Sequence, residues 1–236
     1  MVLEQVAFDI ETTGLDTGDK VTTVGFAVPM GVRVFVRTGD AGVDVGEIEA
    51  SVRERASEHV VVSIHESEAA VLRAVGSFAD ERLRGEDVLL VAYNGERWRD
   101  GFDLPFLRTR SAVTGVEWPF RGVPFADVMP VVTRRFNTTV DGDDHSQLAA
   151  VYETLCDGGL NAVDPFAESS EAVTAFADGR VTDVVLHNVV DVLRTRRLGR
   201  LAERYCAKSE FNVKSLTPTV TSNDSQSSSE RYRRIE

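Results

Sequence analysis

The chain has 236 residues, of which 42% are hydrophobic, and a formal net charge of −12. This length suits one ordinary domain, and the hydrophobic fraction can supply a proper core. No apolar run approaches the roughly 20 residues of a membrane-spanning helix, and the first residues read as a strand without a signal-peptide pattern. The two cysteines, Cys156 and Cys206, lack metal-ligand spacing and indicate reduced thiols. We therefore expect a soluble, cytoplasmic protein with no membrane contact.

The first predicted strand, in the run VAFDIETTGL, carries two acidic residues. Side chains alternate along a strand, so Val6, Phe8 and Ile10 would enter a core while Asp9 and Glu11 share the opposite face. Two like charges this close raise each other's proton affinity unless solvent or a cation compensates them. The pattern predicts either a strand with a solvent-exposed face or a pair of metal ligands at the end of a strand.

A second acid follows a strongly apolar run over residues 88–94, which suits an interior strand. Asp103 stands directly before Leu104, Pro105 and Phe106. An Asp that precedes a proline-containing first helical turn is a good N-cap, so capping and metal binding are both open, and they can coexist. Asp100 competes for the ligand role, but the glycine behind it indicates a turn.

The third acidic segment lies on a predicted helix over residues 181–205, where apolar residues recur at helical spacing. Asp183, His187 and Asp191 are each four residues apart and form one stripe on that helix. Alone, this stripe is typical of a solvent-exposed helix face. Three acidic segments together favour a site for hard divalent cations and phosphodiester cleavage.

These segments resemble the three exonuclease motifs of the DEDD superfamily, which has a ribonuclease-H-like fold. FDIETTG, then YNG followed by FDLPFL, then HNVVD occur in the same order and context. The chain is most similar to the proofreading exonuclease domain of family B DNA polymerases, and PFADVMPVVTRRF and SQLAAVYETL extend the likeness between the motifs. The resemblance covers roughly residues 3 to 206. It implies an α/β, ribonuclease-H-like mixed β-sheet flanked by α-helices.

The resemblance also implies a mechanism and a set of site residues. The implied enzyme is a 3′→5′ exonuclease that hydrolyses the 3′ end of single-stranded nucleic acid, DNA or RNA, with two Mg²⁺ or Mn²⁺ ions. The implied metal ligands and catalytic residues are Asp9, Glu11, Asp103 and Asp191. The positions that match contacts to the terminal nucleotides are Thr12, Thr13, Asn94 and Phe102.

His187 departs from the family pattern, because a histidine stands here at the spacing of the tyrosine found in one subgroup. A four-residue step leaves His187 within about 40° of Asp191 around the helix, so it should point toward the metal ligands. With an ordinary pKa near 6.5, it could accept a proton from a nucleophilic water at neutral pH. We therefore predict that His187 is a catalytic residue that acts as a general base or orients water, and that Asp183, one turn earlier, either orients its ring or is solvated.

The proportions of acidic and basic residues suggest a habitat of high salt concentration. Only three of the 26 basic residues are lysines, and this acidic, lysine-poor composition resembles that of proteins from salt-loving archaea. At about 1 M salt the screening length is only about 3 Å, so repulsion between the surface and a phosphate backbone would be weak. Binding would then depend on contacts from metal ions and arginines to phosphate and from aromatic rings to bases. Phe102 and Trp98 are the candidates for the aromatic contacts.

The remaining expectations concern domains, elements and alternatives. We predict an exonuclease domain over residues 1–208 and a polar, disordered tail over residues 209–236. Strands are expected at 21–28 and 32–38, and helices at 66–84, 103–113, 146–155 and 181–205. Alternatives are an exoribonuclease of the same fold or a non-catalytic nucleic-acid-binding accessory module. A replication or repair protein is a possible partner.

Overall fold

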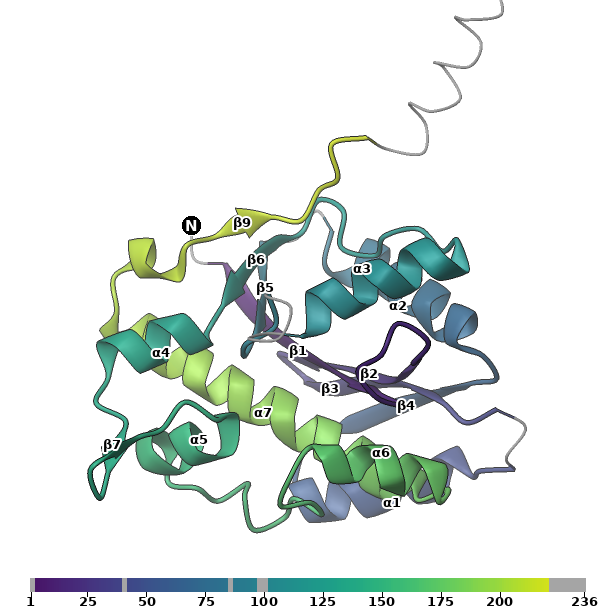
Figure 1. Cartoon of the computed structure of the whole chain (residues 1–236), viewed down its shortest axis with the longest axis horizontal. Coiled ribbons are helices and arrows are strands. Elements are labelled where there is room, and N and C mark those ends of the chain that lie inside the picture. The colour runs from purple at the N-terminus through teal and green to yellow at the C-terminus, as the bar shows by residue number, and fades with distance from the viewer. Residues whose placement is uncertain (1–2, 40–41, 85–86, 97–101, 221–236) are drawn as a thin grey trace, which may run out of the picture.

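A seven-stranded mixed sheet forms the centre of the molecule (Figure 1). The computed structural model describes residues 3–39, 42–84, 87–96 and 102–220. The strand order is β4-β3-β2-β1-β5-β6-β9, with parallel pairs β3/β4, β1/β5 and β5/β6 and antiparallel pairs β1/β2, β2/β3 and β6/β9. The strands are β1 Glu4–Thr12, β2 Val21–Val28, β3 Gly31–Arg37, β4 Val60–His65, β5 Val88–Ala92, β6 Pro124–Asp127 and β9 Lys214–Ser215. A separate hairpin joins β7 Thr139–Val140 to β8 Asp143–Asp144.

Helices cover both faces of this sheet (Figure 1). The described helices are α1 Val45–Ala56, α2 Glu68–Arg82, α3 Asp103–Thr114, α4 Met129–Arg135, α5 Leu148–Cys156, α6 Ser170–Ala177 and α7 Val181–Tyr205. One apolar core joins the sheet to α1, α4, α5 and α7, and a second joins its other face to α2 and α3. The predicted fold class, a ribonuclease-H-like α/β arrangement with a mixed sheet and flanking helices, is confirmed. No helix in the described part of the chain has the length and apolarity needed to cross a membrane.

Strand β1 lies in the middle of the sheet and is buried on both faces. Val6, Phe8 and Ile10 enter the core beneath α2 and α3, as the alternation predicts. Ala7 enters the opposite core, beneath α7. The face that carries Asp9 is therefore covered by a helix, and the alternative of a solvent-exposed strand face is wrong.

The long helix at 181–205 has the predicted bounds, whereas α1, α4, α6, β4 and β6 were not predicted. These elements are short or bury few of their residues, so each carries little sequence from which to predict it. Helix α1, for example, buries only Ile48 and Val52. Strand β6 is four residues long and opens with a proline. Such elements are defined by what packs on them more than by their own pattern.

The folded chain continues past the predicted boundary at residue 208. A 3₁₀ turn, Lys208–Phe211, leads into β9, which pairs with β6 at the edge of the sheet. Phe211 and Leu216 are buried in the two cores, and the indole nitrogen of Trp118 donates a 3.0 Å hydrogen bond to the Leu216 carbonyl. The sheet therefore includes part of the segment that we expected to be a disordered tail. Residues 221–236 lie outside the described residues.

A buried ion pair ties α2 to α3 and to the turn after β1. The guanidinium of Arg110 donates two 2.8 Å hydrogen bonds to the carboxylate of Glu68 and a third to the Thr17 carbonyl. Glu68 also accepts from the backbone amide of Val21. Both charged side chains are only 6% exposed. A buried pair with all its partners in place is costly to break from one side, because the remaining charge loses its compensation.

We expect Glu68→Ala to lower the free energy of unfolding by about 3–5 kcal/mol, because it leaves Arg110 buried without its carboxylate. Urea denaturation followed by circular dichroism measures this change. The matched control is Asp80→Ala, which breaks the exposed pair between Arg84 and Asp80 and should cost at most about 1 kcal/mol. Equal losses in the two variants would contradict the interpretation.

Candidate metal centre

Four buried or half-buried carboxylates from three separate elements meet at the carboxyl end of β1. The four are the acids proposed as ligands: Asp9 and Glu11 on β1, Asp103 at the start of α3, and Asp191 in the middle of α7. Each of the four interacts electrostatically with each of the other three. The fold thus gathers acids that are separated by up to 182 positions in the sequence.

The electrostatics of this cluster are unfavourable when the acids are ionised without a counter-ion. Burial raises the pKa of Asp9, Glu11 and Asp103 well above the ordinary carboxyl range, and neighbouring carboxylates raise it further. A group of hard oxygen donors with this surplus of negative charge fits Mg²⁺ or Mn²⁺. The charge of the cluster is therefore complementary to that of divalent cations.

Asp103 reaches the cluster because the chain after β5 turns sharply. The carbonyls of Asn94, which has a φ of 60°, and Gly95 accept from the amides of Phe102 and Leu104. A side chain at Gly95 would bring a Cβ within 2.9 Å of the Asp103 carboxylate, so only glycine allows this approach. Helix α3 begins at Asp103 itself, and no side chain caps it. The N-cap interpretation of Asp103 is therefore wrong.

Asp9 is held in place by helix α7. The amide nitrogen of Asn188 donates to the Asp9 carboxylate at 2.9 Å and to its backbone carbonyl at 3.2 Å. On β2, Gly25 pairs with Asp9, and a Cβ there would lie 2.0 Å from the Asn188 oxygen. A glycine on the neighbouring strand is therefore needed for the helix to approach β1 this closely.

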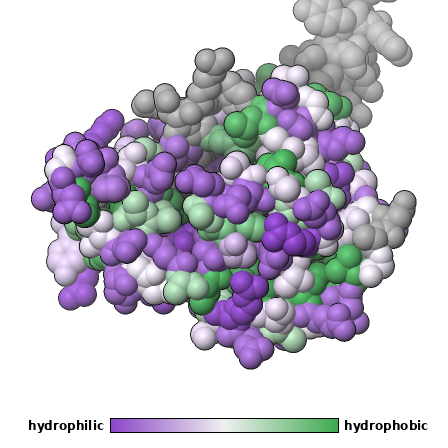
Figure 2. Space-filling view, turned by 60° about the horizontal axis from the view of Figure 1, so that its bottom comes forward, coloured by the Kyte–Doolittle hydropathy of each residue, from purple (hydrophilic) through white to green (hydrophobic). Residues whose placement is uncertain are grey.

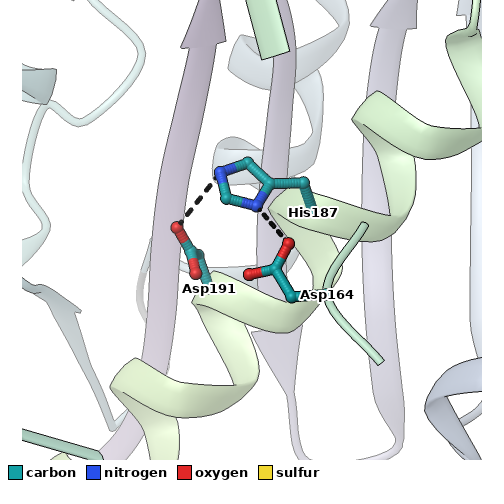
Figure 3. A group of neighbouring side chains, drawn as sticks. All are labelled: Asp164, His187 and Asp191. Atoms are coloured by element: carbon teal, nitrogen blue, oxygen red, sulfur yellow. Dashed lines mark hydrogen bonds and ion pairs between the residues drawn. The ribbon is translucent and has the colours of Figure 1, made fainter. Parts of the chain in front are cut away.

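His187 points toward Asp191, one of the four acids, as the four-residue spacing predicts (Figure 3). Its Nε2 lies 3.7 Å from an Asp191 oxygen and 4.0 Å from a Glu11 oxygen, and its Nδ1 lies 2.8 Å from Asp164. Burial acts to lower the pKa of His187, but the carboxylates of Asp191, Asp164 and Glu11 outweigh it and raise this pKa to about 10. Without cations the imidazole is protonated at neutral pH. General-base duty therefore requires the neighbouring carboxylates to be neutralised first.

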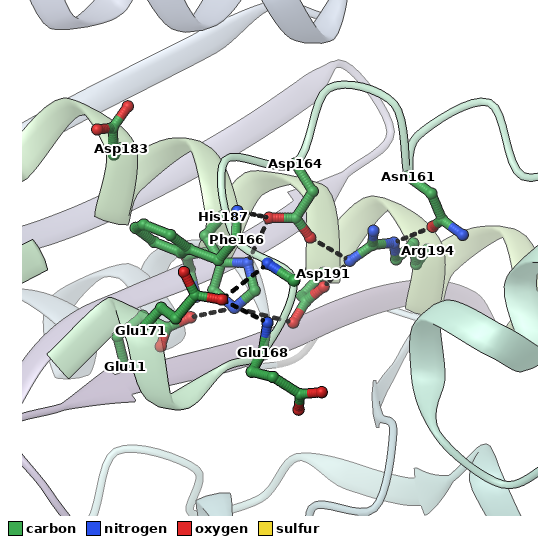
Figure 4. Close-up of polar contacts among 12 residues, drawn as sticks. Glu11, Asn161, Asp164, Phe166, Glu168, Glu171, Asp183, His187, Asp191 and Arg194 are labelled. Carbon is green, nitrogen blue, oxygen red and sulfur yellow. Dashed lines mark hydrogen bonds and ion pairs between the residues drawn. The ribbon is translucent and has the colours of Figure 1, made fainter. Parts of the chain in front are cut away.

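The sequence did not point to Asp164 and Arg194, which complete the network around His187 (Figure 4). The Arg194 guanidinium donates at 2.6 Å to both Asp164 and Asp191. Asp183 instead pairs with Arg55 and Arg180, outside this network, so the suggestion that it orients the His187 ring is wrong. Asp164 lies in a loop without periodicity, but Arg194, an arginine inside a helix stripe that is otherwise buried, was a usable signal.

Asp164, His187 and Asp191 could also hold one metal ion by themselves. One ligand atom from each lies within 4.8 Å of the others (Figure 3). However, Arg194 already supplies a positive charge to both carboxylates. Burial acts to raise the pKa of Asp164, but the hydrogen bond from His187 and the positive charges of His187 and Arg194 outweigh it, so this pKa lies below its ordinary value. This triad is compensated, whereas the cluster of Asp9, Glu11 and Asp103 is not.

A cavity of about 640 Å³ opens onto the acids and is lined by Asp9, Asn94, His187 and Asp191 among others. Of the predicted nucleotide contacts, Asn94 lines this cavity. The hydroxyl of Thr12 donates to the Gly14 carbonyl, and that of Thr13 donates to Asp19, so both are engaged in the turn after β1. Phe102 is half-buried, and its ring lies tilted against that of Phe106, with 4.8 Å between the ring centroids. The competing ligand Asp100 and the candidate aromatic contact Trp98 fall outside the described residues.

Hydrophilic residues make up much of the face of the molecule shown in Figure 2, with apolar side chains among them.

Searches against protein-family models and against curated proteins return no match to this chain. The interpretation of the site therefore depends on its own geometry and on the resemblance of its motifs.

The pKa shifts predict how cations stabilise the fold. Acids whose pKa is raised in the folded state destabilise the fold as pH rises above their ordinary pKa near 4. Protonated His187 stabilises the fold at low pH, and this contribution is lost as pH rises from about 6.5 through about 10. Without cations, both effects make the fold less stable at higher pH. Mg²⁺ or Mn²⁺ should bind better as protons leave. We expect the cation-induced rise in Tm to be larger near pH 8 than near pH 5.5, as measured by scanning calorimetry against a chelator control.

Asp103→Asn tests the same electrostatics on one residue. Removing one of the repelling charges should raise Tm in the presence of a chelator and reduce the gain on adding Mn²⁺. The control is Asp183→Asn on α7, whose carboxylate makes exposed ion pairs outside the cluster and whose loss should leave the Mn²⁺ response unchanged. A full Mn²⁺ response in Asp103→Asn would show that Asp103 is not a ligand.

Proposed function

We propose that this protein is a metal-dependent 3′→5′ exonuclease that hydrolyses phosphodiester bonds at the 3′ end of single-stranded nucleic acid, with DNA as the first substrate to test. The observation that carries the proposal is that the fold places Asp9, Glu11, Asp103 and Asp191 close enough for each carboxylate to interact electrostatically with the other three. The motif resemblance named these residues as the metal ligands. The open cavity beside them supports the proposal, because it gives a strand end access to the acids.

Each residue of the site has a separate role in this proposal. The four carboxylates hold two Mg²⁺ or Mn²⁺ ions, which when bound supply Lewis-acid activation of a water and of the leaving oxygen. Asn188 keeps the Asp9 carboxylate fixed by hydrogen bonding. His187 orients the water or accepts its proton, since its Nε2 faces Glu11 and Asp191 and has no hydrogen-bond partner among the described residues.

Solution conditions follow from the charge of the chain. With a net charge of −12, long-range repulsion of a phosphate backbone is strong at low ionic strength and weak when the screening length falls to about 3 Å at 1 M salt. Substrate contacts that survive such screening are short-range ones, namely metal to phosphate and arginine to phosphate. High salt is therefore the appropriate condition for an assay.

The test is incubation of the purified protein with a 5′-labelled single strand, Mn²⁺ and high salt. We expect a ladder that shortens from the 3′ end. Asp9→Asn and Asp103→Asn should each slow cleavage by about 10²-fold or more, since each removes an anionic ligand of the proposed metal ions, which stabilise charge at the reacting centre. The control Asp183→Asn should cleave at the wild-type rate.

Matched DNA and RNA strands in the same assay separate a deoxyribonuclease from an exoribonuclease, because only the 2′-hydroxyl differs. Strand binding without cleavage, with a normal Mn²⁺ response in Tm, would favour a non-catalytic accessory module. Cleavage that persists in both Asp9→Asn and Asp103→Asn would refute the assignment of these residues.

A further inference from the structure

One carboxylate of the candidate metal centre, that of Asp164, comes from the loop between α5 and α6. Asp164 accepts hydrogen bonds from three groups: the backbone amide of Phe166 at 3.1 Å, Nδ1 of His187 at 2.8 Å, and Arg194 at 2.6 Å. The first of these bonds, two residues along the chain, is an Asx-type turn that fixes the carboxylate relative to its own backbone. Asp164 thus reaches α7 as a rigid acceptor.

Arg194 extends this contact to one of the proposed ligands. One nitrogen of its guanidinium contacts both Asp164 and Asp191, and its Nε donates to Asn161 at 3.0 Å. Asn161 in turn donates to the Ala149 carbonyl on α5. The side chains of Arg194 and Asp164 are only 4% and 5% exposed, so solvent does not compete for these bonds. Two residues of one loop therefore hold both charged partners on α7.

We infer that Asp164 is a positioning residue of this site, which holds the Nδ1–H of His187 and with it the orientation of the ring, and which fixes, through Arg194, the carboxylate of Asp191. An ionised carboxylate can only accept, so the ring nitrogen that faces Asp164 must be Nδ1–H. Nε2 is then the nitrogen that faces Glu11 and Asp191. Partners that lock a functional histidine in this way characteristically change activity by about 10- to 100-fold when they are removed.

This inference rests on the proposed function, but its geometric part can be tested without cations or substrate. The chain has four histidines, so ¹⁵N-labelled imidazoles give a small, assignable set of signals. We expect the Nδ1–H proton of His187, which faces the Asp164 carboxylate, to be shifted far downfield and protected from exchange with water. Asp164→Ala should remove this signal, and Asp183→Asn should leave it intact.

The functional part is tested by kinetics at saturating Mn²⁺. Asp164→Ala should lower kcat for a single-stranded oligonucleotide by about 10- to 100-fold with little change in KM, because the Asp164 carboxylate is already engaged by Phe166, His187 and Arg194. Asp164→Asn keeps the shape and one acceptor oxygen, so it should restore part of the loss and also guards against misfolding of the Ala variant. In a His187→Ala background, Asp164→Ala should cost less than it does in the wild type, since part of its effect is transmitted through His187.

The outcomes separate this inference from the proposed function. If wild-type protein cleaves and Asp164→Ala cleaves equally well, the positioning role is wrong while the nuclease proposal stands. Costs that simply add in the double variant would also overturn it, as would a downfield signal that persists in Asp164→Ala. If the wild type does not cleave under any condition, both the nuclease proposal and the catalytic part of this inference fail.

Discussion

Several like charges are buried at the end of one central strand, and the packing around them must offset the cost of this burial. Placing Asp9, Glu11 and Asp103 in a region with little water costs free energy, which appears as their raised pKa values. A fold does not gain stability from such an arrangement by itself. Two large apolar cores, one on each face of the sheet, provide the stability that offsets it.

The same packing that supplies this stability also sets the positions of the acids. Helix α7 lies against β1 and β2, and it contributes both apolar residues to the core and polar residues to the site. Asn188 and His187 are therefore placed with the accuracy of core side chains. Gly25 and Gly95 remove the side chains that would keep α7 and Asp103 away. The geometry of the site is thus a consequence of how closely the helices approach the sheet.

Sequence reasoning identified the parts of the site that have a local signature. Alternation along a strand placed Asp9 beside Glu11, and helical spacing placed His187 beside Asp191. In contrast, Asp164 has no periodic context, and only the folded loop brings it within 2.8 Å of His187. The cap interpretation of Asp103 was also a local inference, and it is wrong because the turn at Asn94 and Gly95 directs the carboxylate into the cluster. Short elements such as β6 were missed for a related reason, since their neighbours determine their conformation.

The balance of charge in the centre bears on how many cations it would take. Five carboxylates surround two positively charged groups, His187 and Arg194, because Asp164 joins the four proposed ligands. Three negative charges then lack compensation when all the acids are ionised. Nearby Asp127, which accepts hydrogen bonds from the backbone amides of Asn94 and Met129, adds a further negative charge that acts on Asp103. One divalent ion cannot balance three charges and an incoming phosphate, whereas two can, so the charge balance favours the proposal of two ions over one.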